Sequence, residues 1–276
     1  MESRADLFGD VRIDAAEPAA AYLGGKRNLA RRLVPMIDGA RARIYAEPFV
    51  GMGGVFLRRR VQAPVEVIND YSRDIATFFR IVQRHYPQFV EMLRFQITTR
   101  AEFERLSKVD PDTLTDLERA ARFLYLQVCA FGGKVSGRNF AIDTYQGGAF
   151  NLLTILPRLE DIHTRLARVT IERKPFGDFI SIYDKPDTLF YLDPPYWGGE
   201  KDYGADMFER ADFERLAEQL EGIAGQFILS INDVPEIRDL FAWAKITPVD
   251  VTYSIGNSNQ TAKELIIQGA ERRSAG

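Results

Sequence analysis

Residues that build covalent cross-links and metal sites are scarce in this chain. Its 276 residues include a single cysteine, Cys129, and two histidines, His85 and His163. One cysteine cannot form an intramolecular disulfide or a cysteine-based zinc site. Two histidines do not predict a histidine-rich metal site either. This cysteine usage is typical of a reducing cytoplasm, where we expect the protein to work.

Long apolar runs are also missing. No stretch of about 18 consecutive apolar residues occurs, so the sequence predicts no membrane-spanning helix. The first 18 residues are acidic and lack the apolar centre of a signal peptide, and we expect them to form a loose arm.

The chain carries little net charge, but its charges are unevenly distributed. A net charge of -3 and a pI of about 5.6 argue weakly against nucleic-acid binding, for which basic domains are usual. Residues 119–174, however, hold nine basic and four acidic residues, whereas residues 176–240 hold five basic and fifteen acidic residues. Either residues 119–174 face phosphate groups while residues 176–240 do not, or the choice of these two ranges exaggerates an ordinary variation in charge along the chain.

Apolar runs followed by turn and helix signals occur at both ends of the chain. Residues 42–85 predict a β-α-β-α unit, and the same alternation returns at Val169. Between them the apolar spacing predicts helices, followed by an exposed glycine-rich loop or hairpin at 132–150. We therefore expect one α/β domain built from residues 19–86 and 168–276. A mostly helical insert would occupy residues 87–167.

Ligand chemistry is expected where the predicted strands end, because parallel sheets bind ligands at the carboxyl ends of their strands. Three of these strands end at Glu47, Asn69 and Asp193. The first leads into the glycine-rich segment EPFVGMGG, whose backbone can pass close to a ligand at a helix N-terminus. It lacks the GxGxxG spacing and the P-loop lysine, which disfavours dinucleotides and ATP. A purely structural turn is the alternative.

Three weaker signals lie near these strand ends. Asp70 follows the second strand, where it could accept hydrogen bonds from ribose hydroxyls or be a solvated turn carboxylate. Lys26 precedes the first strand and could meet a carboxylate, or be solvated. Asp178 could accept from a cofactor amino group, although its position favours an N-cap of the following helix.

The sharpest motif is Asp193-Pro194-Pro195-Tyr196, which ends the apolar strand TLFYL. Two prolines constrain the backbone and carry no N–H, so the neighbouring carbonyls are left as acceptors. Asp193 adds a side-chain acceptor and Tyr196 a flat ring. This set suits an aromatic amine. The carbonyl and the carboxylate would accept its two N–H protons, and its ring would stack on Tyr196.

Together these segments resemble the Dam-type family of DNA N6-adenine methyltransferases. The likeness runs in order from about Tyr22 to Gln268 and rests on YLGGKR, EPFVGMGGVFL, VIND, FLYLQVCAFGGKVSGRNF, DPPYWG and SIGNSNQTAKELII. The resemblance implies a Rossmann-like, S-adenosylmethionine-dependent methyltransferase sheet with an inserted helical DNA-recognition domain. It also implies methyl transfer to the N6 amino group of adenine in double-stranded DNA, by base flipping, in a prokaryotic or phage-infected cell.

The resemblance assigns roles to individual residues. Those that would bind S-adenosylmethionine are Tyr22, Lys26, Phe49, Gly51, Gly53, Asp70 and Asp178. Those that would hold the target adenine are Asp193, Pro194 and Tyr196. The candidates for DNA contacts are Lys134, Arg138 and Asn139. Their loop departs from the family's aromatic-Asn-Gly and Arg-Tyr-Asn pattern, so the recognition sequence is not predicted.

Other functions remain open at the level of the sequence. The chain could methylate another amine, in RNA or protein, or it could be a catalytically silent DNA-binding protein. Cytosine C5 methylation is disfavoured because it needs a nucleophilic thiolate, whereas Cys129 lies in an apolar helical pattern. A monomer is plausible, and the oligomeric state is not predicted.

Overall fold

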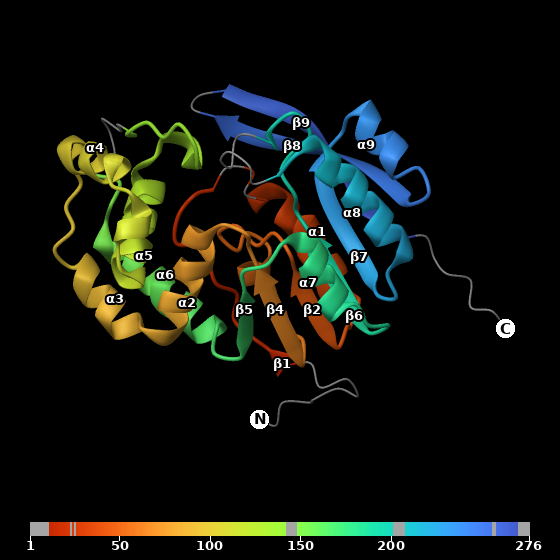
Figure 1. Ribbon diagram of the computed structural model, residues 1–276, viewed down its shortest axis with the longest axis horizontal. Coiled ribbons are helices and arrows are strands. Elements are labelled where there is room, and N and C mark those ends of the chain that lie inside the picture. The colour runs from red at the N-terminus through yellow and green to blue at the C-terminus, as the bar shows by residue number, and fades with distance from the viewer. Residues whose placement is uncertain are drawn as a thin grey trace.

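A seven-stranded sheet lies at the centre of the computed structural model, which describes residues 11–22, 24, 26–141, 148–200, 208–255 and 258–269 (Figure 1). Along the sheet the strand order is β5-β4-β2-β6-β7-β9-β8. The strands are β2 (Ile44–Glu47), β4 (Val65–Asn69), β5 (Val169–Glu172), β6 (Thr188–Leu192), β7 (Gln226–Asn232), β8 (Lys245–Ile255) and β9 (Ser258–Gln268). The first five in sequence are mutually parallel, whereas β9 runs antiparallel to both β7 and β8.

The order of the strands reverses between β2 and β6. Numbered along the chain within this sheet, the strands follow the order 3-2-1-4-5-7-6. An open, mostly parallel sheet of this kind binds ligands beyond the carboxyl ends of the strands that flank such a reversal. This order confirms the predicted Rossmann-like α/β fold, and it directs attention to the ends of β2 and β6.

Alternation of side chains along each strand divides the core into two clusters. On β6, Phe190 belongs to one buried cluster and Tyr191 to the other, and on β2 Tyr45 and Ala46 divide in the same way. Successive side chains point to opposite faces of a strand, so apolar runs such as TLFYL bury both faces at once. Helices α7 (Phe176–Tyr183), α8 (Arg210–Gly222) and α9 (Pro235–Leu240) cover one face, and α1 (Arg27–Gly39) lies behind the other.

The chain between β4 and β5 is helical over most of its described length. Its helices are α2 (Arg73–Arg84), α3 (Tyr86–Leu93), α4 (Arg100–Lys108), α5 (Asp116–Cys129) and α6 (Leu152–Arg165). Helix α5 begins at a capping box in which Thr115 and Glu118 each bind the other's backbone N–H. Phe78 of α2 contacts Phe89 of α3 and Phe123 of α5. These rings belong to the same buried cluster as one face of the sheet, so the insert packs directly on the α/β core.

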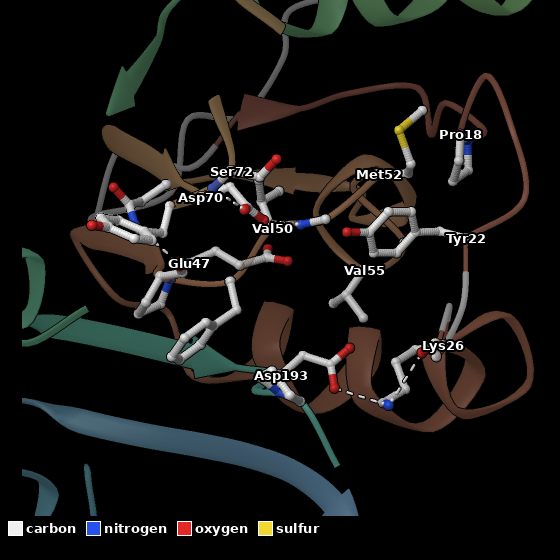
Figure 2. A pocket seen from close by; sticks show the side chains of 18 of the residues that line it. Pro18, Tyr22, Lys26, Glu47, Val50, Met52, Val55, Asp70, Ser72 and Asp193 are labelled. Atoms are coloured by element: carbon white, nitrogen blue, oxygen red, sulfur yellow. Dashed lines mark hydrogen bonds and ion pairs between the residues drawn. The ribbon is translucent and has the colours of Figure 1, made fainter. Parts of the chain in front are cut away.

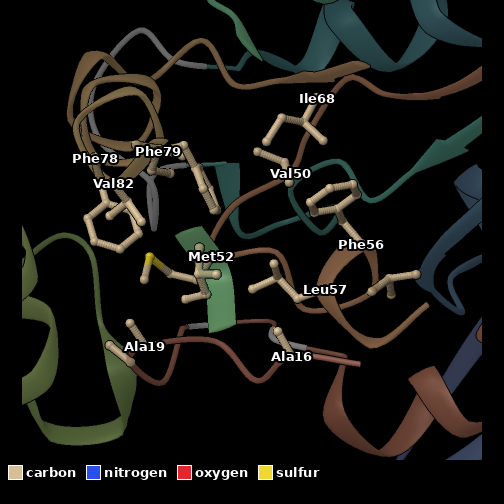
Figure 3. Close-up of a cluster of buried hydrophobic side chains, with 14 of the residues drawn as sticks. Ala16, Ala19, Val50, Met52, Phe56, Leu57, Ile68, Phe78, Phe79 and Val82 are labelled. Carbon is tan, nitrogen blue, oxygen red and sulfur yellow. The ribbon is translucent and has the colours of Figure 1, made fainter. Parts of the chain in front are cut away.

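Two sequence-based expectations are wrong in detail. Residues 11–18 are not a loose arm, because β1 (Val11–Arg12) pairs with β3 (Val61–Gln62) and Ala16 is buried beside Leu57. The helix expected after the glycine motif is a single 3-10 turn, Phe56–Arg58. In Figure 3 Met52, Phe56 and Leu57 lie in the buried cluster, so this segment fills the core between the sheet and the N-terminal segment.

Strands β8 and β9 form an antiparallel pair at one edge of the sheet, from Lys245 with Gln268 to Ile255 with Ser258. Among the described residues no helix combines the length and apolar character needed to cross a bilayer. The domain boundaries at 86/87 and 167/168 stay a prediction.

A buried charge network joins the sheet to the insert. Glu66 of β4 accepts hydrogen bonds from Arg59 at 2.6 Å and from Arg165 of α6 at 2.5 Å. The two guanidinium groups also stack on Tyr45 and Phe56, at 3.8 and 4.0 Å from the ring centroids. All three charged side chains are at most 3% exposed, so each needs the others to offset the loss of hydration.

We expect Glu66→Ala to lower the free energy of unfolding by about 3–5 kcal/mol, because it leaves two buried guanidinium groups without their shared carboxylate. Urea denaturation followed by circular dichroism measures this change. The matched control is Glu91→Ala, which removes a carboxylate whose ion pair with Arg94 is exposed, and it should cost less than about 1 kcal/mol. Equal effects of the two substitutions would contradict the assignment.

Candidate active site

A cavity of about 470 Å³ opens where β2, β4 and β6 end. It lies at the reversal of strand order and within the size range of small-molecule sites. Figure 2 shows Tyr22 and Glu47 pointing toward one another across it, with Asp193 and Lys26 along one side. The predicted site residues that line it are Tyr22, Lys26, Phe49, Gly51, Asp70 and Asp193.

The turn after β2 needs glycine at two positions for different reasons. Gly51 and Gly53 have φ values of 51° and 76°, which side chains rarely tolerate. A Cβ on Gly51 would lie 3.0 Å from Cε1 of Tyr22, so glycine lets the Tyr22 ring rest on the turn. A Cβ on Gly53 would lie 2.8 Å from Cγ of Leu57, which belongs to the core. Gly53 is not among the described residues that line the cavity, and here it shapes the turn.

Asp70 holds this turn in place from the neighbouring strand end. Its carboxylate accepts hydrogen bonds from the backbone N–H of Gly51 at 3.0 Å and of Ser72 at 2.9 Å. Burial raises the pKa of Asp70 to about 6, against the lowering effect of these two bonds. Each carboxylate oxygen can accept a further hydrogen bond, so Asp70 can also receive a ligand hydroxyl.

Lys26 connects the start of α1 to the end of β6. The lysine is 2% exposed, and its Nζ lies 2.9 Å from Oδ1 of Asp193 and 2.9 Å from the hydroxyl of Tyr196. The Tyr196 hydroxyl in turn donates to Oε1 of Glu264 on β9 at 2.7 Å. Lys26 Nζ is 3.8 Å from the other oxygen of Glu264. Two carboxylates and one phenol therefore surround a single buried ammonium.

The surroundings of Asp193 raise the pKa of its side chain above the usual value for an aspartic acid. Burial raises its pKa to about 6, Lys26 lowers it and the nearby Glu264 raises it. Ser230 donates to Oδ1 at 3.2 Å and itself bonds the Tyr191 hydroxyl at 2.8 Å. Asp193 is thus ionised near neutral pH, and Lys26 and Ser230 both hold its Oδ1 oxygen.

Three phenylalanine rings form an aromatic part of the cavity wall. Phe49, from the turn after β2, contacts Phe176 at 5.7 Å and Phe208 at 5.9 Å between ring centroids. All three rings line the cavity. A flat apolar group such as a nucleobase would bury its faces against such rings.

Comparison with known proteins identifies the class of enzyme. A family model described as D12 class N6 adenine-specific DNA methyltransferase matches residues 22–255. The chain belongs to this family. The expected enzyme class, an adenine-specific DNA methyltransferase that uses S-adenosylmethionine, is thereby confirmed.

Three curated relatives show the same affiliation at modest identity. The type II methyltransferase M.CviBI of Paramecium bursaria Chlorella virus NC1A is 22% identical over 231 residues, 82% of this chain and 86% of the relative. The type II methyltransferase M1.LlaDCHI of Lactococcus lactis subsp. cremoris is 26% identical over 268 residues, 90% and 92% of the two chains. The DNA adenine methylase of Salmonella typhi is 24% identical over 255 residues, 84% and 88% of the two chains.

Some predicted site residues of this adenine methyltransferase lie away from the cavity wall. Pro194 and Tyr196 are not among the described residues that line it, whereas Pro195 is. Asp178 is exposed in the first turn of α7 and does not line the cavity in the described part of the chain. Its interpretation as an N-cap is wrong, because Pro175 occupies that position and no side chain makes a capping bond there.

The three candidate DNA contacts of the methyltransferase lie in a short hairpin. Its ends are joined by the bridge between Ala130 and Phe140, and residues 142–147 of the predicted loop lie outside the described part. Lys134 and Asn139 are exposed. Arg138 is half-buried, donates to Oε1 of Gln127 at 3.3 Å, and has its pKa lowered by burial.

Two buried acids of the site had no role assigned from the sequence. Glu47 lines the cavity and accepts a 2.5 Å hydrogen bond from Tyr45, and burial raises its pKa well above the usual range. Glu264 of β9 directly precedes the apolar run Leu265–Ile267, and this position beside a buried run was the available signal. Cys129 is buried with a pKa raised to about 11, which suits the predicted core position and not a thiolate nucleophile.

We expect Lys26→Met to raise the pKa of Asp193 above its present value of about 6, because the cation that favours the carboxylate is removed. A carbon-13 NMR titration of aspartate-labelled protein measures this shift. Lys174→Met is the matched control, since Lys174 also lines the cavity but pairs with Glu172. An unchanged or lower pKa in Lys26→Met would show that the ion pair is absent in solution.

Proposed function

We propose that this adenine-specific DNA methyltransferase acts on duplex DNA, with Asp193, Pro194 and Tyr196 at the reacting centre. The observation that carries the proposal is the position of Asp193. Its carboxylate borders the same cavity as the glycine turn and Asp70, and Lys26 holds it from behind. The proposed cofactor pocket and Asp193, the proposed acceptor for the target amine, therefore belong to the same cavity.

The cavity residues fit S-adenosylmethionine. When bound, this cofactor supplies an electrophilic methyl group on a positively charged sulfur. Gly51 allows close backbone approach, Asp70 offers a carboxylate to ribose hydroxyls, and Phe49 offers an aromatic face. Glu47 and Asp193 are buried acids whose pKa values are raised, and a cation beside them would favour their ionised forms. Tyr22 and Lys26 complete the proposed cofactor side. Asp178, which is exposed in the first turn of α7, is proposed as a further cofactor contact outside the described cavity wall.

The residues after β6 suit a target amine. The Asp193 carboxylate and the Pro194 carbonyl accept the two N6 protons, which directs the nitrogen lone pair toward the methyl group. When the cofactor is bound, transfer would form the nitrogen–carbon bond, break the carbon–sulfur bond and leave neutral S-adenosylhomocysteine. The proton that N6 would lose would pass to the Asp193 carboxylate, which already accepts it in a hydrogen bond. Positioning and electrostatics provide the catalysis without a covalent enzyme intermediate.

Target adenines are stacked inside duplex DNA and must be flipped out, at a cost of a few kcal/mol. Stacking on the Tyr196 ring would offset about 1–3 kcal/mol of this. The two hydrogen bonds of the Tyr196 hydroxyl, with Lys26 and Glu264, support this role because they fix the ring's orientation. We propose that the enzyme works as a cytoplasmic protein and can act as a monomer.

The deciding experiment uses S-adenosylmethionine with a labelled methyl group and duplex DNA free of adenine methylation. Nucleoside analysis should place the label in N6-methyladenine, and mapping of the modified positions should give the recognition sequence. Label found in RNA or protein, with none in DNA, would overturn the proposal. Cofactor binding that fails altogether would instead favour a silent DNA-binding protein.

Asp193→Asn should lower kcat by at least about 10²–10³-fold, because the amide replaces one acceptor oxygen with a donor. Affinity for the neutral product S-adenosylhomocysteine, measured by calorimetry, should change little. The wild-type kcat/KM for DNA, at saturating cofactor, should fall about tenfold per pH unit below the pKa of Asp193, since protonation removes the acceptor. That pKa is about 6 in the ligand-free protein and is lower beside the cationic cofactor. Asp70 titrates in the same range, so Asp70→Asn is the control that should keep this acidic limb. Near wild-type turnover in Asp193→Asn would refute the role.

Lys134→Ala should weaken DNA binding and reduce the slope of log affinity against log salt by about one, as expected for one lost phosphate contact. Fluorescence anisotropy at several salt concentrations measures both quantities. Arg138→Ala should also weaken binding, through the loop that it braces on Gln127 as well as through charge. Lys185→Ala, an exposed lysine before β6, is the control and should leave the slope unchanged. An unaltered slope in Lys134→Ala would remove it from the DNA interface.

A further inference from the structure

A buried glutamine joins three segments that are distant in sequence. Gln127 of α5 is 1% exposed, and its side-chain nitrogen donates to the carbonyl of Ala21 at 2.8 Å and to that of Gly133 at 2.7 Å. Its side-chain oxygen accepts from Arg138 at 3.3 Å. Both N–H groups and the oxygen of one amide are thus engaged with the N-terminal segment and with the hairpin at 130–141.

The hairpin and the N-terminal segment touch backbone to backbone. A Cβ on Gly133 would lie 2.8 Å from the carbonyl carbon of Ala21 and 2.9 Å from the nitrogen of Tyr22. Gly133 also has a φ of 67°, so glycine permits both the turn and the close approach. No layer of side chains separates the two segments at this point, and a shift of one must displace the other.

The same N-terminal segment forms part of the cofactor cavity. Ala20, Ala21 and Tyr22 line it, and the Tyr22 ring rests on the turn at Gly51. The hairpin reaches the cavity as well, through Val135. Gln127 therefore lies where the proposed DNA-contacting hairpin and the proposed cofactor wall meet.

We propose that Gln127 is a positioning residue that holds the hairpin at 130–141 and the segment 20–22 in one arrangement, so that duplex DNA and the cofactor bind with positive coupling. The inference rests on the proposed roles of the hairpin and the cavity. Either ligand would order the shared unit, and the second ligand would then bind at a lower entropic cost. Coupling between two sites is reciprocal and typically amounts to a 5–150-fold change in affinity.

The chemistry of the amide explains why glutamine is required. Gln127→Glu keeps the shape but places a carboxylate against two carbonyl oxygens, and both donated hydrogen bonds are lost. Gln127→Met keeps a similar length without any donor. Both variants should release the hairpin from the N-terminal segment while the residues that border the reacting centre stay intact.

The test compares the dissociation constant of S-adenosylhomocysteine, by calorimetry, with and without saturating duplex that contains the mapped target site. In the wild type DNA should lower this constant at least about 5-fold, the lower end of usual coupling. In Gln127→Glu and Gln127→Met the ratio should fall below about 2-fold. Gln83→Met is a matched control, because the Gln83 amide likewise bridges two carbonyls, of Leu166 and Val169, at 2.7 and 2.8 Å. It should keep the wild-type ratio, which excludes a general effect of losing a bridging amide.

Each outcome bears on one of the two proposals. A wild-type ratio retained in both Gln127 variants overturns the positioning role. Absence of coupling in a wild type that binds both ligands also overturns it, but leaves the proposed function intact. Failure of the wild type to bind S-adenosylhomocysteine or DNA removes the proposed function and, with it, the inference.

Discussion

The buried ammonium of Lys26 is the interaction on which the arrangement of the site depends. A lysine with 2% exposure is tolerated only when opposite charge and acceptors replace its hydration. Asp193 from the end of β6 and the Tyr196 hydroxyl lie within 2.9 Å of it, with Glu264 of β9 at 3.8 Å. Asp193 and Tyr196 belong to the motif after β6 and Glu264 to β9, so satisfying one charge brings the start of α1, this motif and the antiparallel strand together.

A second constraint acts on the other side of the cavity. Asp70 binds the backbone of Gly51, and Gly51 in turn supports the ring of Tyr22. Tyr22 lies four positions before Lys26, so the N-terminal segment is held at two points where it lines the cavity. Gln127 and Gly133 then seat the hairpin on the same segment. The site is thus a set of strand ends covered by a segment that also touches the insert.

Elements that carry their own pattern could be predicted from the sequence. Apolar runs that end at Glu47, Asn69 and Asp193 identify buried parallel strands, because both faces of such strands are covered. Asp178 shows the limit of local pattern, since a shift of three residues in the start of α7 moves it from a capping position to an exposed first turn. The 3-10 turn at Phe56–Arg58 was missed for a similar reason. Its apolar residues predict that the segment is buried, but they do not predict how long a helix can be packed in the core.

The sequence alone determined the chemical groups and their order: the glycine turn, the acidic strand end, the Asp-Pro-Pro-Tyr motif, and the helical stretch that separates them. Only the tertiary structure decided which of these groups meet. Lys26 and Tyr196 are 170 positions apart, and Gln127 is 106 positions from Ala21. Periodicity reports which face of an element is buried, whereas the partner across that face is set by strand order and close packing. For that reason the roles of Glu264 and Gln127 became visible only in the fold.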